Sequence, residues 1–166
     1  MFLFRLVYFS RNRVKELGNP VTKEMRAILD ASTRNNLAAA LTGGLIFNDH
    51  YFAQVIEGDR CGVTSMFCKI ARDRRHSDLT LLEAKAVDQR LFTDWAMAYA
   101  GHSDAIDLLY LKHSVTIGFH PKSMSADSLT GFIRDLVRSD ARVAHAPITH
   151  TADVKLMAEA RERAGV

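Results

Sequence analysis

The sequence predicts an α+β fold. The prediction rests on which segments resemble strands, which resemble helices, and the order in which they follow one another. Segments rich in β-branched and aromatic residues are expected as strands at 2–9, 41–47, 51–57, 79–87 and 95–100. Between them lie two segments whose apolar residues recur at helical spacing. The order is therefore β-α-β-β-α-β-β. It is typical of a ferredoxin-like βαββαββ sandwich, in which two helices cover one face of a sheet, here of five strands.

The first strand and the first helix are justified by alternation and by capping residues. The strand Phe2–Phe9 places Tyr8 on an apolar face, because alternate side chains of a strand share a face. After a loop, Asn19 as N-cap and Pro20 at the first helical position predict the start of a helix. Its apolar spacing predicts an end near Asn35 and Asn36.

A hairpin and a second helix follow. Three polar residues, 48–50, separate two strands and predict a compact turn between them. On the second of these strands, Gln54 lies between two apolar residues of the same face. Asp59 is expected to cap the second helix, whose apolar residues recur at i, i+3, i+4 and i+7. If the first and third strands are central, Gln54 lies near Tyr8 on the face that the helices cover.

The last third of the chain changes character. Helices are predicted over 104–112 and 125–138, and a polar tail over 152–164. We therefore divide the chain into a domain of residues 1–101 and a helical appendage of residues 102–166. The appendage is expected to serve packing, oligomerisation or output.

Composition narrows the function mainly by exclusion. The 166 residues are 48% hydrophobic and 25% charged, which excludes a disordered chain. The longest uncharged run is shorter than the roughly 18 residues of a membrane span, so no membrane association is expected. Two cysteines, Cys61 and Cys68, make no disulfide framework and are expected to be buried and inert in a cytoplasmic protein. No metal-ligand spacing occurs among the histidines. A net charge of +3 disfavours a nucleic-acid-binding module, and no nucleophile–base pair indicates an enzyme.

Three polar side chains stand among apolar neighbours, namely Tyr8, Asn36 and Gln54. A buried polar group without a hydrogen-bond partner costs about 1 to 3 kcal/mol, so each of the three needs a partner. Two explanations stay open from the pattern. The three groups satisfy one another, or Asn36 is simply a C-cap. Alternatively, they surround a planar ligand that offers several hydrogen-bonding edges.

A series of motifs resembles the BLUF domain, the flavin-based blue-light sensor. The motifs are LVYFS at 6–10, RNN at 34–36, LTG at 41–43, FAQVIEG at 52–58, DRRH at 73–76 and RLFTDWAM at 90–97. Together they cover residues 3–99 in the order and spacing of the family. Leu41 stands where Ile or Val is common, and Ile56 where Leu is usual. The appendage is similar to that of short stand-alone BLUF proteins of the PixD type.

The resemblance implies a cofactor and roles for particular residues. Oxidised FAD, with FMN or riboflavin as alternatives, would lie between the two helices. Tyr8 would be the photochemical electron and proton donor, and Gln54 would bridge Tyr8 and the flavin. The implied cofactor-binding residues are Tyr8, Asn35, Asn36, Gln54, Lys69, Asp73, Arg75 and His76. Trp95 and Met97, two apart on the last strand, are either core packing or the photoactive readout, and both interpretations stay open.

The function implied is signalling rather than catalysis. A blue-light photoreceptor would regulate a separate downstream signalling protein, with no nucleic acid involved. Rearranging one or two hydrogen bonds supplies about 1 to 3 kcal/mol, whereas a full two-state shift needs roughly 5.5 kcal/mol. A homo-oligomer that adds the contributions of its protomers is therefore expected. The alternative functions are a ferredoxin-like flavin-dependent oxidoreductase and a small-ligand-binding regulatory domain.

Overall fold

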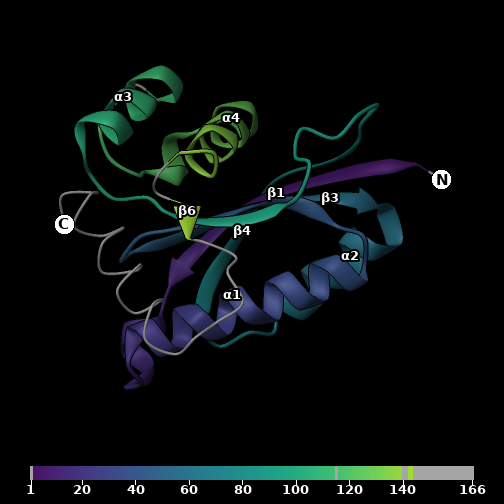
Figure 1. Ribbon diagram of the computed structural model, residues 1–166, viewed down its shortest axis with the longest axis horizontal. Coiled ribbons are helices and arrows are strands. Elements are labelled where there is room, and N and C mark those ends of the chain that lie inside the picture. Colours follow the sequence, from purple (N-terminus) through teal and green to yellow (C-terminus); the bar gives the residue numbers. More distant parts are fainter. Residues whose placement is uncertain (1, 115, 140–141, 144–166) are drawn as a thin grey trace.

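A mixed sheet forms the centre of the molecule (Figure 1). The computed structural model describes residues 2–114, 116–139 and 142–143. The strands are β1 (Leu3–Asn12), β2 (Thr42–Phe47), β3 (Tyr51–Asp59), β4 (His76–Ala86), β5 (Trp95–Tyr99) and β6 (Arg142–Val143). Their order in the sheet is β4-β1-β3-β2-β5-β6. Only β2 and β5 pair in parallel; the other neighbours are antiparallel.

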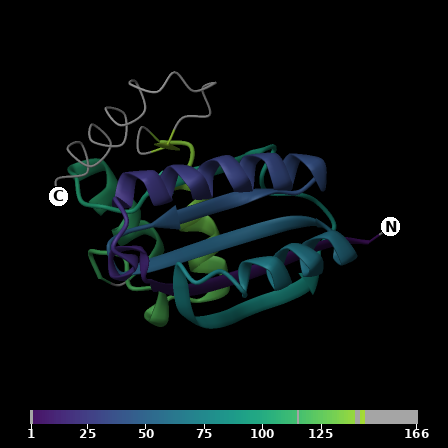
Figure 2. The ribbon, with the colours of Figure 1, turned by 90° about the horizontal axis from the view of Figure 1, so that it is seen from below.

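The predicted sandwich is confirmed. Two helices, α1 (Val21–Ala38) and α2 (Arg60–Ile70), cover the same face of the sheet, as Figure 2 shows from below. The expected strands 1 and 3 are adjacent at its centre, where α2 packs on both of them. Asp59 caps α2 as expected, because its carboxylate accepts a hydrogen bond from the Gly62 N–H at 2.9 Å. The short strand β6, from the C-terminal segment, extends the five expected strands to six.

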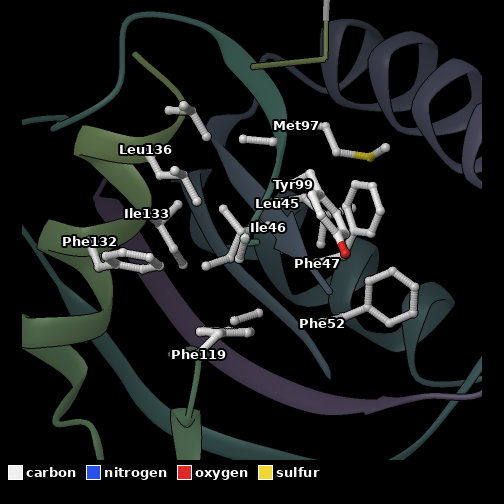
Figure 3. Packing of buried hydrophobic residues seen from close by; sticks show 14 of the residues in the cluster. Leu45, Ile46, Phe47, Phe52, Met97, Tyr99, Phe119, Phe132, Ile133 and Leu136 are labelled. Carbon is white, nitrogen blue, oxygen red and sulfur yellow. The ribbon is translucent and has the colours of Figure 1, made fainter. Parts of the chain in front are cut away.

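Two further helices, α3 (Asp104–His113) and α4 (Ala126–Leu136), cover the opposite face (Figure 1). Ser125 caps α4 by accepting from the Ser128 N–H at 3.1 Å. The apolar side of α4 packs on β1, β2 and β3, and Figure 3 shows Phe132, Ile133 and Leu136 directed at the sheet. Because both faces are covered, β1 is buried continuously from Arg5 to Ser10. The predicted tail at 152–164 lies outside the described residues.

Some element ends differ from the prediction for identifiable reasons. Strand β1 continues to Asn12, because its end pairs with β4, which itself begins at His76. A 3₁₀ helix, η1 (Val14–Leu17), occupies part of the expected loop, and a second, η2 (Pro121–Ser123), precedes α4. Pro20 is the N-cap of α1, and the Asn19 side chain donates instead to Glu24 at 2.9 Å.

The structure also bears on two expectations drawn from composition. The prediction of buried cysteines is wrong, since Cys61 and Cys68 are both exposed. The buried residues of α2 are Val63 and Met66, and the thiols lie on the outer side of the helix. Among the described residues, no helix is long and apolar enough to cross a membrane.

Candidate functional site

A pocket with a cavity volume of about 180 Å³ lies between α1, α2 and the sheet. All of the sequence-predicted cofactor residues line it: Tyr8, Asn35, Asn36, Gln54, Lys69, Asp73, Arg75 and His76. The other lining residues, mostly apolar, are Ile28, Ala31, Ser32, Leu45, Phe52, Met66 and Ile70. An apolar pocket with a few convergent polar groups is the usual form of a small-molecule site.

Asn36 is the most unusual of these residues. Helix α1 continues past it to Ala38 and is capped by Ala39, so Asn36 is not a C-cap. It lies one turn from Ser32 and two from Ile28, which places it on the stripe of α1 that faces the cavity. The residue is 1% exposed, yet neither its Nδ2 nor its Oδ1 atom has a partner among the described residues. A buried amide without partners points to a ligand.

Tyr8 and Gln54 do satisfy one another. They are direct cross-strand partners in the β1–β3 register, and both are almost fully buried. The Tyr8 hydroxyl donates to Gln54 Oε1 at 2.6 Å. Burial raises the pKa of Tyr8 well above its ordinary value, and the Asp73 carboxylate raises that pKa further. The phenol is therefore neutral at physiological pH. With Oε1 turned to Tyr8, the Gln54 amide nitrogen is directed elsewhere.

The charged lining residues Lys69, Asp73 and Arg75 are partly or fully exposed, so we call this side the mouth of the pocket. Ion pairs of Arg75 with Asp73 and with Glu24 form a strap there. Arg75 Nε donates to both carboxylate oxygens of Asp73, at 2.9 and 3.0 Å. Its Nη1 lies 3.8 Å from Glu24 Oε2, which joins the segment after α2 to α1. Burial opposes ionisation of Asp73, but the hydrogen bonds and charge of Arg75 outweigh it and lower the pKa of Asp73. Lys69 is exposed one turn earlier on α2, so the mouth carries two cations.

His76 is held by the protein at both ring nitrogens. Nδ1 lies 2.8 Å from Ser10 Oγ, and Nε2 lies 2.7 Å from the Ile70 carbonyl oxygen. The ring also meets Phe52 edge-on, with centroids 6.4 Å apart. In this arrangement the imidazole forms a wall of the pocket and offers a ligand its carbon edge.

Trp95 and Met97 share a face of β5, as expected, but neither lines the pocket. Both are buried, at 6% and 0% exposure. The register puts Met97 opposite Leu45, which is itself opposite Gln54. Trp95 belongs to the next row, opposite Gly43. A row of side chains thus runs from the Tyr8–Gln54 pair through Leu45 to Met97.

Sequence reasoning did not assign the remaining lining residues, Leu45 among them, to the cofactor site, and it did not find Glu24. Leu45 could be found only from the pairing register, because periodicity does not say which residue of β2 faces Gln54. Glu24 closes the strap with Arg75, and nothing in the sequence links these distant charges. Among the described residues, no cluster of His, Cys, Asp or Glu could hold a metal ion.

A ferredoxin-like sheet with a partly polar pocket under two helices defines a small-molecule-binding domain. The sequence profile of BLUF, described as sensors of blue-light using FAD, matches residues 3–98. The chain therefore belongs to the BLUF family, and FAD is the cofactor that defines this family.

Known structures and sequences agree with this membership. The chain is similar to the structure titled BlsA photo-activated state, with a TM-score of 0.71 and 26% identity, covering 82% of this chain and 96% of that one. It is also similar to BlrB, a BLUF protein in its dark state, with a TM-score of 0.53 and 35% identity over 59% of this chain and 71% of that one. The likeness to BlsA covers more of this chain than the family match does, so it reaches into the C-terminal helices.

The curated relatives are larger proteins. The chain is 26% identical over 89 residues to photoactivated adenylate cyclase subunit beta of Euglena gracilis, which covers 52% of this chain and 10% of the cyclase subunit. The corresponding protein of Euglena longa is 25% identical over 89 residues, 52% of this chain and 10% of that protein. The match therefore spans about a tenth of the length of these relatives.

Proposed function

We propose that this protein is a blue-light photoreceptor that binds oxidised FAD in the pocket between α1 and α2. It signals by rearranging the hydrogen bond between Tyr8 and Gln54. The observation that carries the proposal is the Asn36 amide, which is buried in the pocket wall with both of its polar atoms unpaired among the described residues. The edges of a flavin ring carry donors and acceptors, so such a ring is a fitting partner for this amide.

The other pocket residues have roles that follow from their positions. The cavity is smaller than the roughly 300 to 1,000 Å³ of typical ligand sites, so it suits the ring rather than the whole dinucleotide. Lys69 and Arg75, at the mouth, would then neutralise the phosphates. Asp73 orients Arg75 by accepting from its Nε, its Nη2 and its backbone N–H. Asn35 is exposed where it lines the pocket. Apolar residues such as Ile28 and Met66 would exclude water from the ring.

The proposed light response needs an electron donor beside the cofactor and a second group whose hydrogen bonds stay rearranged after the light reaction. Bound oxidised flavin would supply the absorption of blue light and, once excited, a strong electron acceptor. Tyr8 holds its proton at Oη until it gives up an electron, because burial keeps the phenol neutral. The proton would then have a short path to Gln54 Oε1, 2.6 Å away. The electron and the proton would both return to Tyr8, so that only the hydrogen bonds differ at the end. If the Gln54 amide turns, its nitrogen faces Tyr8 and its oxygen faces the pocket, which exchanges donor and acceptor at the ring.

The proposed output is regulation of a separate signalling protein, with the chain acting in the cytoplasm as a homo-oligomer. One amide rearrangement is worth about 1 to 3 kcal/mol, which biases a two-state equilibrium without reversing it. Several protomers acting together would make the bias larger. The role is sensory rather than catalytic, because the pair exchanges hydrogen bonds in place. Trp95 and Met97 would relay the change along β5.

Absorption spectroscopy of the purified protein tests this function. We expect a yellow protein whose flavin band shifts reversibly to longer wavelength under blue light. Tyr8→Phe should keep the flavin and lose the shift, because the donor is gone. Tyr51→Phe is the matched control, since Tyr51 is on the same sheet but contacts Phe9 and Phe119 on the other face. A protein that takes up no flavin, or a flavin reduced by a nicotinamide donor with no light shift, would favour the alternative functions instead.

A further inference from the structure

Glu57 is a buried charged residue that the pocket does not use. It lies on β3 three residues after Gln54, and alternation directs it to the opposite face of the sheet. Its side chain is fully buried. One carboxylate oxygen accepts from Arg5 Nε at 2.7 Å, which neutralises the charge. A buried carboxylate is tolerated when it is paired and hydrogen-bonded, so its other contacts are informative.

Those other contacts all lead to one loop, the segment between β4 and β5. The carboxylate accepts from the backbone N–H of Leu91, at 3.0 Å to Oε2, and of Phe92, at 3.1 Å. The backbone carbonyl of Glu57 accepts from Arg90 Nη1 at 2.8 Å. Leu91 and Phe92 are therefore held by one residue of β3, Glu57. Arg90 is shared between two strands, because its Nη1 also donates to Thr42 Oγ1 of β2 at 2.7 Å. Residues 91 and 92 should therefore follow β3 if that strand shifts.

The next residues of the chain are attached elsewhere. The Gly43 N–H donates to the Asp94 carbonyl at 3.0 Å, and β5 then pairs with β2. A displacement of β3 relative to β2 therefore acts on Thr93, the one residue between Phe92 and Asp94, and through it on Phe92. The loop is thus a junction between the strand that carries Gln54 and the strand that carries Trp95 and Met97.

The Phe92 side chain connects this junction to α4. Phe92 is 4% exposed. A Cβ atom placed on Gly44 of β2 would lie 3.4 Å from the Phe92 ring, 2.6 Å from Ile133 Cγ2 and 3.2 Å from Val137 Cγ1. Because Gly44 has no side chain, the Phe92 ring and the α4 side chains can both pack against the backbone of β2 at this position. Figure 3 shows Ile133 on the side of α4 that faces the sheet.

We propose that Glu57 is a positioning residue for the light response, which transmits a change at Gln54 through the loop of residues 90–92 and the Phe92 ring to α4. The inference rests on the proposed function, because it supplies the route from the pocket to the face that α3 and α4 cover. Glu57 does not touch the pocket. Its loss should leave the spectral change intact and remove the response of the helix.

Hydrogen–deuterium exchange of the flavin-loaded protein, in darkness and under continuous blue light, tests this route. In the wild type, light should change the exchange rates of α4 amides by about fivefold or more, the low end of usual coupling between sites. In Glu57→Gln, the absorption shift should persist while the light-dependent change at α4 disappears. Glu83→Gln is the matched control, because Glu83 on β4 has an ion-pair partner of its own, Lys85. It should behave as the wild type does.

The outcomes separate the inference from the function on which it rests. Two outcomes would overturn the inference and leave the proposed function standing. One is a light-dependent exchange change at α4 in Glu57→Gln that is as large as in the wild type. The other is an absorption shift in the wild type without any exchange change at α4. Absence of any absorption shift in the wild type would reject the proposed function, and the inference with it. Should Glu57→Gln fail to fold, Phe92→Leu decides, since it keeps the backbone bond to Glu57 and removes the ring. A wild-type response at α4 in that variant would overturn the inference.

Discussion

The two faces of the sheet treat buried polar groups in opposite ways. On the face that α3 and α4 cover, the carboxylate of Glu57 has Arg5 and two backbone N–H groups as partners. On the face that α1 and α2 cover, a cavity remains and the Asn36 amide has no partner within the described chain. We call the first the closed face and the second the incomplete face, after the pairing of these two buried polar groups. A second pocket, lined by Phe9, Tyr51 and His120 among others, lies on the side of the closed face. A ligand site is therefore indicated by a buried polar group that lacks partners and not by a buried polar group as such, since Glu57 and Asn36 are both buried and polar.

The closed face also has continuous aromatic packing. The rings of Tyr110 and Phe132 stack with centroids 4.7 Å apart, and Phe119 stacks on the same Phe132 ring at 6.1 Å. The Tyr110 hydroxyl donates to the Gly101 carbonyl at 3.1 Å, so this ring brings no unpaired group into the core. We expect this face to supply stability and the incomplete face to supply binding.

The largest effect is expected in the closed face, from Phe132→Ala. Phe132 is fully buried between two aromatic rings, so its truncation should lower the free energy of unfolding by about 3 to 5 kcal/mol. Leu108→Ala, on the outer side of α3 with the residue 68% exposed, should change it by less than about 0.5 kcal/mol. Urea unfolding measures both. Similar losses in the two variants would contradict a closed core between α3, α4 and the sheet.

Asn36→Leu should reveal the incomplete face by two effects of opposite sign. Without cofactor, removing an unpaired buried amide should raise the free energy of unfolding by about 1 to 3 kcal/mol. Flavin affinity should fall, because the ring loses its partner. Urea unfolding of the apoprotein and a fluorescence titration with FAD measure these quantities.

Asn12→Leu is the matched control, since its amide donates to the Asn48 carbonyl and accepts from the Val14 N–H. It should lower stability by a similar amount, about 1 to 3 kcal/mol, and leave flavin affinity unchanged. If Asn36→Leu destabilises the apoprotein as much as this control does, the Asn36 amide is not an unpaired group.

A smaller effect is expected where α3 and α4 meet. A Cβ atom on Gly131 would lie 2.7 Å from the His113 ring, which Asp135 holds at 2.8 Å. Gly131→Ala should therefore cost about 1 kcal/mol in the free energy of unfolding, although Ala normally stabilises a helix interior. In Gly62→Ala on α2, the nearest contact of the new atom is an ordinary 3.5 Å, so this control should not be destabilised. Thermal unfolding of the two variants compares them, and equal midpoints would contradict the close approach.

The smallest effect concerns acid stability of the same contact. Burial opposes ionisation of Asp135, but hydrogen bonds from Lys112, His113 and Arg134 outweigh it and lower the pKa of Asp135. A lowered folded-state pKa means that the contribution to stability is present above the unfolded value of about 3.9 and is lost as the pH falls below it. Asp135→Asn should therefore flatten the loss of stability below about pH 4. Parallel curves for the wild type and the variant would exclude this contribution.

Much of the site could be predicted from the sequence because it depends on strand alternation and on a familiar order of elements. Tyr8 and Gln54 are on adjacent central strands in any sandwich of this order, and the structure has them as direct partners. The assignment of Lys69, Asp73 and Arg75 to the cofactor site came from the resemblance to the family. Periodicity alone would have placed these residues at a solvated helix end. The structure brings these residues to one pocket.

The rest depends on contacts that no local pattern encodes. Whether the Asn36 amide has hydrogen-bond partners could be decided only from all the atoms around it. An asparagine is equally suitable as a helix C-cap and as a polar residue in a pocket wall, so the sequence alone does not distinguish the two. The role of Glu57 depends on the path of the loop between β4 and β5, and loops have no period to extrapolate. Strand β6 is only two residues long, too short to produce a pattern.

The light-minus-dark infrared difference spectrum of the flavin-loaded protein, prepared with ring-labelled tyrosine, tests the central claim most directly. If light rearranges the bond between Tyr8 and Gln54, the phenol C–O band of one tyrosine should shift in the wild type and in Tyr51→Phe. That band should be missing from the difference spectrum of Tyr8→Phe. An absorption shift with no tyrosine band in the wild type, or a tyrosine band that persists in Tyr8→Phe, would contradict the account.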